Sequence, residues 1–265
     1  MAGIPVVERG WQYLLDHTTE FQLKTLVTFA VHELFYWGSF LPFLILDRIP
    51  YCRRWKIQDT PNTKSAQLLC FRQVFVTHLC LVLPIIIFTH PIFDLIGSKH
   101  AFPLPTATTI ILQIALFFVI EDAAFYVGHR LLHTSYLYKK VHSVHHLHSA
   151  PFGIAAEYAH PFEVLFLGLA TFLGPMIVGP HHLTLLLYLG LRCVQTVECH
   201  SGYDFPWSMN RWFPGYGGAD FHDHHHRSYS GNYSSTFTWV DWIMGTDVGY
   251  RKWKKLQNEK ALQDA

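Results

Sequence analysis

The sequence predicts an all-α integral membrane protein, a bundle of about four transmembrane or re-entrant helices with a cytosolic, histidine-rich helical cap. Half of the 265 residues are apolar and only 15% are charged, whereas a soluble domain carries about 25% charged residues. The mean hydropathy is +0.17. The chain also contains 19 histidines, nearly as many as its 20 lysines and arginines together.

Five apolar segments define the expected helices. They span residues 23–46, 74–93, 107–128, 162–180 and 183–199. A helix needs roughly 20 apolar residues to cross the hydrocarbon core, and the first three segments meet this length. The last two are separated by Gly179 and Pro180, so residues 162–199 form either a re-entrant hairpin or two full spans. We expect one membrane-embedded domain over residues 1–265, with a catalytic region at 121–247.

The distribution of basic residues predicts the orientation. The 47–73 loop carries six lysines and arginines, and such loops face the cytosol. The acidic N-terminal segment, in which no signal peptide is visible, then lies in the lumen. The third helix returns the chain to the cytosolic face, and the hairpin keeps it there. Residues 129–160 and 200–265 therefore share one face.

Charge and cysteine usage exclude other classes of protein. The net charge of +1 gives no basis for nucleic-acid binding. The five cysteines form no Cys-x-x-Cys pair, so neither a disulfide framework nor an iron–sulfur cluster is expected. A Gly-x-Gly-x-x-Gly dinucleotide motif is also absent, so any reductant must arrive on a partner.

Three histidine clusters indicate a metal centre. Residues three or four apart lie on one face of a helix, so each cluster can direct two or three imidazoles toward one point. Eight histidines, with His200 as a ninth, exceed the needs of one ion and suit two. Imidazole binds zinc, copper, iron or nickel, so ligand type alone leaves the metal open. The clusters are His129 and His133; His142, His145 and His146; and His222, His225 and His226.

The remaining histidines divide into two sets. We expect His224 to lie on a different side of its helix from its neighbours, whereas His148 and His160 could be ligands or could orient one. Isolated histidines on apolar segments are usually structural. This set comprises His17, His32, His78, His90, His100, His181 and His182.

Acidic residues in apolar helices usually have a function, because placing a carboxylate in a membrane-spanning segment costs free energy. Asp122 lies seven residues before His129, on the same helical face, and Tyr126 lies between them. We expect these two residues to orient a ligand by accepting its N–H. The alternative is a helix-end acid that contacts Arg130 or water. Weaker candidates for the same role are Glu157, Glu163 and Glu198.

The pattern His-x3-His, His-x2-His-His and His-x2-His-His after membrane spans resembles the fatty acid hydroxylase/sterol desaturase superfamily of membrane di-iron enzymes. The resemblance covers about residues 121–247. Within the superfamily it is closest to the C4-methylsterol monooxygenases, of the shorter plant type. The strings that carry it are Glu121-Asp122-x3-Tyr126-x2-His129-Arg130, Pro151-Phe152-Gly153, Glu157-Tyr158-Ala159-His160-Pro161, Gly217-Gly218-Ala219-Asp220-Phe221-His222-Asp223, Asn232-Tyr233-Ser234-Ser235-Thr236-Phe237 and Asp241-Trp242-Ile243-x-Gly245-Thr246-Asp247.

This resemblance implies two iron ions per chain, held by the eight clustered histidines, with His200 matching an isolated histidine of the family. His224 departs from the pattern, since tyrosine is expected there. The implied reaction oxidises the C4α methyl group of a sterol precursor through alcohol and aldehyde to carboxylate. It uses O2 and electrons from NAD(P)H, relayed by cytochrome b5 and its reductase.

The implied location is the endoplasmic reticulum membrane, with several passes and the histidines facing the cytosol. Expected partners are the bilayer, the sterol and other enzymes of C4 demethylation. Two alternatives stay open: another lipid hydroxylase or desaturase of the superfamily, and a membrane protein that binds or transports a metal.

Overall fold

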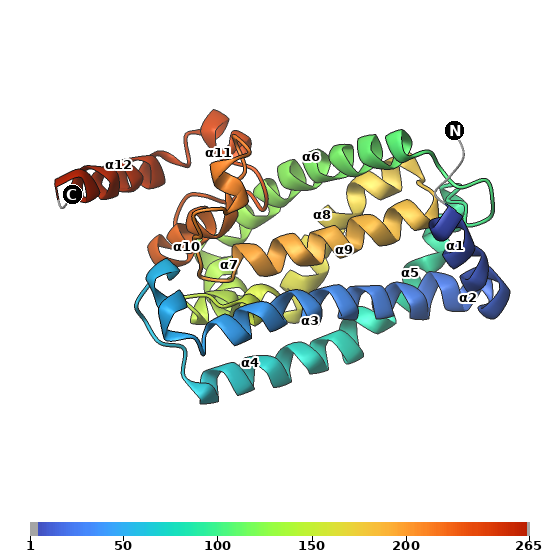
Figure 1. Cartoon of the computed structure of the whole chain (residues 1–265), viewed down its shortest axis with the longest axis horizontal. Coiled ribbons are helices and arrows are strands. Elements are labelled where there is room, and N and C mark those ends of the chain that lie inside the picture. Colours follow the sequence, from blue (N-terminus) through green and yellow to red (C-terminus); the bar gives the residue numbers. More distant parts are fainter. Residues whose placement is uncertain (1–4, 264–265) are drawn as a thin grey trace.

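The computed structural model describes residues 5–263, and helices make up its regular secondary structure (Figure 1). Within these residues, extended pairing is limited to two isolated bridges, Lys56 with Tyr203 and Tyr216 with Phe237. The all-α class predicted from the sequence is therefore confirmed.

The α-helices are α1 (Pro5–His17), α2 (Glu20–Gln22), α3 (Thr28–Leu46), α4 (Lys64–Thr77), α5 (Leu83–Leu95), α6 (Ala107–Leu132), α7 (Ser135–Lys140), α8 (Pro161–Val178), α9 (His182–Cys199), α10 (Gly218–Ser228), α11 (Trp239–Met244) and α12 (Val248–Gln263). Two π-helical turns, η1 (Leu23–Val27) and η3 (His78–Val82), join α2 to α3 and α4 to α5. The 3-10 helices are η2 (Pro50–Trp55), η4 (His142–Leu147), η5 (Gly153–Glu157) and η6 (Met209–Arg211).

Four helices are long and apolar enough to cross a membrane. They run over Glu20–Leu46, Lys64–Leu95, Ala107–Leu132 and Pro161–Val178, with 27, 32, 26 and 18 residues. Each contains the core of an expected segment, and the second begins ten residues before the expected 74–93. Large apolar side chains such as Leu34, Phe88 and Ile111 are 66–81% exposed on them. Lipid is the solvent that such a surface requires.

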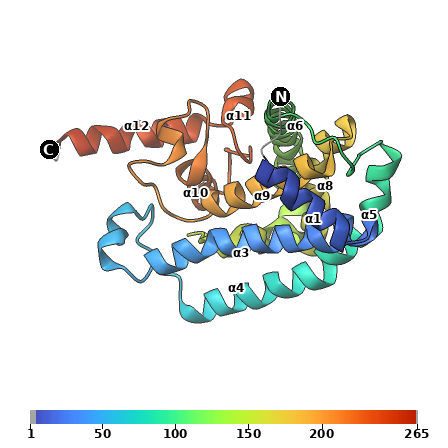
Figure 2. The ribbon, with the colours of Figure 1, turned by 45° about the vertical axis from the view of Figure 1, so that its right-hand side comes forward.

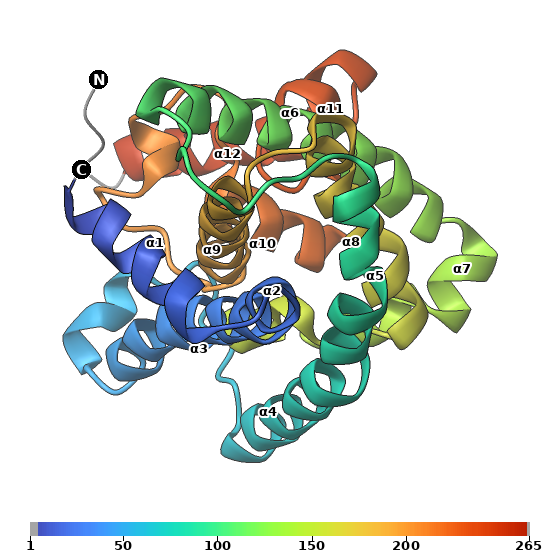
Figure 3. The same ribbon diagram turned by 90° about the vertical axis from the view of Figure 1, so that its right-hand side faces the viewer.

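The 162–199 segment forms two antiparallel helices. Gly179 ends α8 in the left-handed conformation at φ 61°, which glycine adopts without steric cost. α8 is one of the four long apolar helices, whereas α9 is the buried helix of the bundle and packs against α3 and α6. Figure 3, which looks along the bundle, shows α9 near the centre with α3, α6 and α8 around it.

The histidine-rich elements gather at one end of the bundle. α10 lies at the end opposite α1, as does α7, which stands between the first two histidine clusters in the sequence (Figure 1). α12 projects away from α10 in both Figure 1 and Figure 2. The regions 129–160 and 200–263 thus share one end, as the charge distribution predicted. That this end faces the cytosol remains a prediction.

The α6–α8 contact depends on small residues. A Cβ added at Gly174 of α8 would lie 3.0 Å from the Cα and Cδ1 atoms of Phe117, and one at Gly128 of α6 would lie 3.0 Å from Cδ2 of Leu167. Close backbone approach through small residues is a common way to pack helices in membranes. α6 carries His129, so this contact also fixes the position of a candidate ligand.

We predict that Gly174→Leu destabilises the protein by about 1–3 kcal/mol, because the added side chain must displace the backbone of α6. Gly168→Leu on the same helix is the matched control, since a Cβ at Gly168 meets nothing within 4 Å. Its effect should stay within about 0.5 kcal/mol. Thermal unfolding in detergent measures both, and equal losses would contradict this account of the α6–α8 contact.

Candidate metal centre

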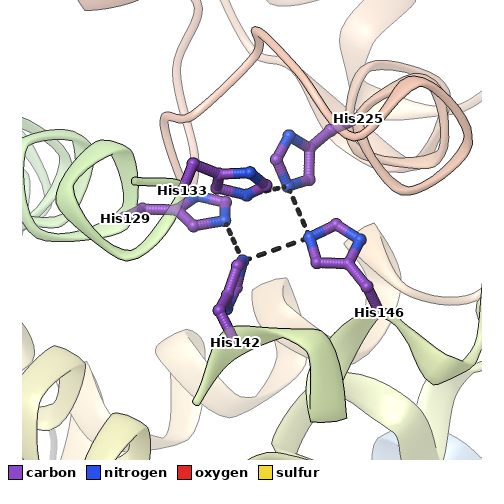
Figure 4. Close-up of side chains that lie close together, drawn as sticks. All are labelled: His129, His133, His142, His146 and His225. Carbon is purple, nitrogen blue, oxygen red and sulfur yellow. Dashed lines mark hydrogen bonds between the residues drawn. The ribbon is translucent and has the colours of Figure 1, made fainter. Parts of the chain in front are cut away.

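Five histidines from three elements converge in a first group (Figure 4). Two come from the end of α6, two from η4 and one from α10. Their Nε2 atoms approach in a chain: 3.0 Å from His129 to His142, 3.1 Å from His142 to His146, 3.1 Å from His146 to His225, and 3.2 Å from His225 to His133. The five ligand nitrogens all lie within 4.8 Å of one another, so they surround a single point.

A second group contains four histidines. Nε2 of His222 lies 2.9 Å from that of His200 and 3.1 Å from that of His226, and Nε2 of His145 lies 3.3 Å from that of His200. His200 follows the last residue of α9, so the buried central helix supplies this ligand. The two groups adjoin, since the His226 ring lies 4.7 Å from both the His145 and the His146 ring.

The sequence clusters do not map one to one onto these groups. Each cluster directs two of its imidazoles at one group, as the spacing predicted, but in two of the three clusters the third histidine enters the other group. In η4, His142 and His146 enter the first group while His145 enters the second; in α10, His225 separates from the other two. Neighbouring residues on a helix point about 100° apart. A run of histidines therefore straddles two sites instead of filling one.

Hydrogen bonds at the opposite side of the rings fix the protonation of five of these histidines. In four of them the Nδ1–H donates to a backbone carbonyl, which can only accept, and in His142 it donates to Glu163 in its carboxylate form, so Nε2 carries a lone pair. The acceptors are Tyr233 O for His129 (2.7 Å), Glu163 Oε1 for His142 (2.8 Å), Tyr158 O for His145 (3.1 Å), Thr196 O for His200 (2.8 Å) and Gly231 O for His225 (2.7 Å).

Lone pairs that face one another at about 3 Å repel unless a cation lies between them. The contact between His145 and His200 is such a pair, since the Nδ1–H of each ring donates to a backbone carbonyl. A metal–nitrogen bond of about 2.1 Å places ligands at right angles about 3.0 Å apart. The observed spacing of 2.9–3.3 Å therefore fits a metal ion in each group, and five nitrogens exceed the four of tetrahedral zinc.

Burial keeps these imidazoles neutral. It lowers the pKa of His145 to about 4 and the pKa values of His133, His142 and His200 to about 3. In α10, burial together with repulsion from neighbouring imidazoles holds the pKa values of the three candidate ligands well below the usual range. A neutral imidazole is the form that binds a metal.

The role expected for Asp122 needs correction. Asp122 Oδ1 accepts backbone N–H groups of Thr236 (2.8 Å) and Phe237 (3.0 Å) instead of a ligand N–H. Because Asp122 belongs to α6 and faces the 232–237 loop, it holds that loop, whose Tyr233 carbonyl orients His129. The Tyr126 hydroxyl likewise accepts from Arg130 (3.0 Å) and lies 3.2 Å from Thr246 Oγ1, so it touches no candidate ligand.

Of the other residues considered as ligands or as orienting groups, one contacts a candidate ligand. Glu163 contacts a candidate ligand, whereas the Glu198 carboxylate accepts a hydrogen bond from the Tyr216 hydroxyl (2.8 Å).

The histidines outside the two groups have other contacts. His224 packs against Tyr250 and Trp253, away from both groups. His160 caps α8 by accepting the Phe162 N–H, and His148 packs against Phe152 and Tyr158. Glu157 lies with His32 and His78 in a separate cluster.

No spacing in the sequence indicates that backbone carbonyls orient the candidate ligands, or that Asp241 takes part. Its carboxylate accepts the backbone N–H groups of Tyr233 (2.9 Å) and Ser234 (2.8 Å). Asp122 and Asp241 thus hold the same loop from opposite ends. An Asp-Trp pair before a glycine carries no recognisable metal spacing, so only the folded chain reveals this function.

We predict that Glu163→Ala weakens metal binding by about 10- to 100-fold, the usual effect of removing a group that orients a ligand. Glu163→Gln should weaken binding less, because its amide oxygen can still accept the Nδ1–H of His142. Metal titration of the purified variants checks both. Equal affinities in the two variants would show that the acceptor oxygen of residue 163 does not orient His142.

We predict that the metal-free protein loses stability as the pH falls from about 6.5 toward 4. An unfolded histidine has a pKa of about 6.5, and the folded pKa of His145 is about 4. Between these values the unfolded chain binds more protons, so stability falls with decreasing pH by up to about 1.4 kcal/mol per pH unit for each such histidine.

Thermal midpoints at pH 7 and pH 5 measure this effect. The double variant His145→Gln with His200→Gln should show a shallower decrease than the original protein, and His17→Gln on α1 should leave the decrease unchanged. A double variant with the original slope would mean that these two imidazoles do not cause the pH dependence.

Comparison with known proteins agrees with this architecture. Residues 114–246 match the fatty acid hydroxylase family. Methylsterol monooxygenases 2-2 and 2-1 of Arabidopsis thaliana are 50% and 48% identical to the chain, each over 95% of it and over 96% and 98% of their own lengths. A very-long-chain aldehyde decarbonylase of Oryza sativa subsp. indica is 48% identical over 96% of both chains. No solved structure matches. The chain therefore belongs to the fatty acid hydroxylase family of oxidoreductases.

Proposed function

We propose that the protein oxidises the C4α methyl group of a sterol precursor, using two iron ions held by the nine histidines of the candidate metal centre. The observation that carries the proposal is the convergence of five and four imidazole nitrogens at two adjoining points. The choice of a sterol substrate is supported by the relatives named methylsterol monooxygenases, which align over nearly the whole chain.

Bound iron supplies the O2-dependent oxidation that a methyl C–H bond requires and that amino-acid side chains cannot supply. Three rounds convert the methyl group to alcohol, aldehyde and carboxylate. Each round consumes one O2, two electrons and two protons. The protein's own contribution is to hold the ligands rigidly in a site from which bulk water is excluded. Eight of the nine histidines are buried and His133 is half-buried.

The surroundings of His133 favour a lipid substrate. Val127 and Leu131 lie just before it on α6 and are 65% and 47% exposed, so the apolar surface of the span leads up to this ligand. The rings of Tyr138 and Tyr233 lie 5.5 and 5.1 Å from the His133 ring. A flat, apolar molecule that enters from the bilayer would meet aromatic faces here.

We further propose that the metal-centre end faces the cytosol of the endoplasmic reticulum, where cytochrome b5 and its reductase deliver electrons from NAD(P)H. Basic residues support this orientation, since Arg53 and Arg54 of η2 and Lys252 and Lys255 of α12 are exposed at that end. An exposed basic helix also suits an acidic redox protein, whose encounter it would accelerate.

A second candidate is very-long-chain aldehyde decarbonylation, because the rice relatives so named are 48% identical to this chain. The same metal centre and membrane access would serve a long-chain aldehyde. The two functions differ in product: an oxidised sterol in one, a hydrocarbon shortened by one carbon in the other.

We predict that purified protein with cytochrome b5, its reductase, NADH and O2 converts a 4-methylsterol to its 4-carboxy product. His145→Ala and His225→Ala should each abolish conversion, because each removes a ligand from one of the two groups. His224→Ala is the matched control: it lies in α10 between ligands but faces Trp253, so activity should persist.

The same preparation offered a C26 or C30 aldehyde tests the second candidate. Hydrocarbon without sterol oxidation would assign the decarbonylase activity instead. Sterol oxidation undiminished by both ligand variants would refute the assigned metal centre.

A further inference from the structure

A second polar cluster lies within the bundle, apart from the nine histidines. It consists of His32 and Glu33 of α3, His78 of η3 and Glu157 of η5, and we call it the His–Glu quartet. The side chains are 13%, 20%, 0% and 22% exposed, respectively. Three of the four belong to the apolar spans Glu20–Leu46 and Lys64–Leu95. Ionisable groups are costly at such places and usually mark function.

Glu157 orients both imidazoles from one side. Its Oε2 accepts a hydrogen bond from Nε2 of His78 at 2.9 Å, and its Oε1 lies 3.3 Å from Nε2 of His32. One carboxylate thus offers an oxygen to each ring. Histidines that bind metals usually donate their other ring N–H to a carboxylate in this manner, which leaves the remaining nitrogen free to bind.

The remaining nitrogens face Glu33 on the other side. Nδ1 of His32 lies 3.0 Å from Glu33 Oε1, in a hydrogen bond, and Nδ1 of His78 lies 2.8 Å from the same oxygen. The Nδ1 of His78 is buried and forms no hydrogen bond, despite this short distance, because the oxygen does not lie along its N–H direction. Nδ1 of His78 and Oε1 of Glu33 thus have the relation of two ligands of one ion, because they are about 3 Å apart and do not point at each other. A metal ion here would replace the hydrogen bond between His32 and Glu33.

The other contacts of the quartet hold its side chains in place, as a binding site requires. Glu33 Oε2 accepts the Trp37 indole N–H at 2.7 Å, so its carboxylate is held in place. The π-helical turn η3 begins at His78, and such turns frequently occur at functional sites. Two carboxylates at this depth also require two positive charges. One divalent cation supplies them, as would two additional protons on the imidazoles.

We propose that His32, Glu33 and His78 bind one divalent metal ion of the zinc class, with Glu157 orienting both histidines. Two histidines and one glutamate form a known zinc ligand set, with a fourth position open to water. Such an ion would tie α3 to η3 and, through Glu157, to η5. This site goes beyond the proposed sterol oxidation and does not depend on it.

Elemental analysis of the purified full-length protein after incubation with ZnCl2 and dialysis tests this site. We expect Glu33→Gln and His78→Ala each to lose one equivalent of zinc while the iron content stays unchanged. His90→Ala, in the same long helix, is the matched control and should retain the zinc. Glu157→Gln should weaken zinc affinity by about 10- to 100-fold without changing the stoichiometry.

Several outcomes would overturn the assignment. Equal zinc content in the original protein, Glu33→Gln and His78→Ala would show that protons on the imidazoles, and not a metal ion, balance the two carboxylates of the quartet. Cys193 lies on the Glu157 side of His32, so loss of the zinc in Cys193→Ser would refute the proposed ligand set. If both quartet variants fail to fold, the iron-loaded original protein decides: it should take up one further equivalent of Zn2+ in titration, and no uptake excludes the site.

Discussion

The mutual repulsion of buried imidazole lone pairs is the constraint around which this protein is organised. Ring nitrogens approach within 3.0–3.3 Å where water is largely excluded, and burial prevents protonation from relieving the repulsion. Without a cation this arrangement is a source of instability, and with one it becomes a source of cohesion. A metal ion bound at this point would therefore be thermodynamically linked to the folding of this end of the bundle.

The fold meets that constraint by bringing ligands from elements that differ in rigidity. His129 and His200 sit at the ends of α6 and α9, two helices fixed by the packing of the bundle. The α10 ligands depend on a less regular region, which Asp122 and Asp241 hold through backbone N–H groups. A rigid helical half and a loop half held by two carboxylates thus meet at the candidate metal centre. The orienting acceptors are mostly backbone carbonyls, whose positions follow from the fold itself.

Features of the site that depend on neighbouring residues in the sequence could be predicted, whereas features that depend on contacts between distant segments could not. Spacing of three or four residues identified eight of the nine histidines that the structure brings together, because helical periodicity is local. His200 stands alone in the sequence and could only be named as a possible ninth. Spacing did not reveal that His145 and His146 serve different groups, since that depends on the 3-10 geometry of η4 and on where α9 ends. The face of Asp122 was inferred correctly, yet a loop more than 110 residues away takes its hydrogen bonds. Similarly, nothing in the sequence pairs His32 with His78, because their two spans meet only in the folded bundle.

The short segment around η5 connects the two polar clusters of the molecule. The Tyr158 carbonyl orients His145 in the metal centre, and the preceding residue, Glu157, orients His78 in the His–Glu quartet. Tyr36 of α3 holds the same segment by donating to the Ile154 carbonyl at 2.7 Å. A shift of η5 would therefore move a ligand of one cluster and the orienting carboxylate of the other together. The quartet, deep among the apolar spans, is thereby mechanically coupled to the end of the bundle where the nine histidines converge.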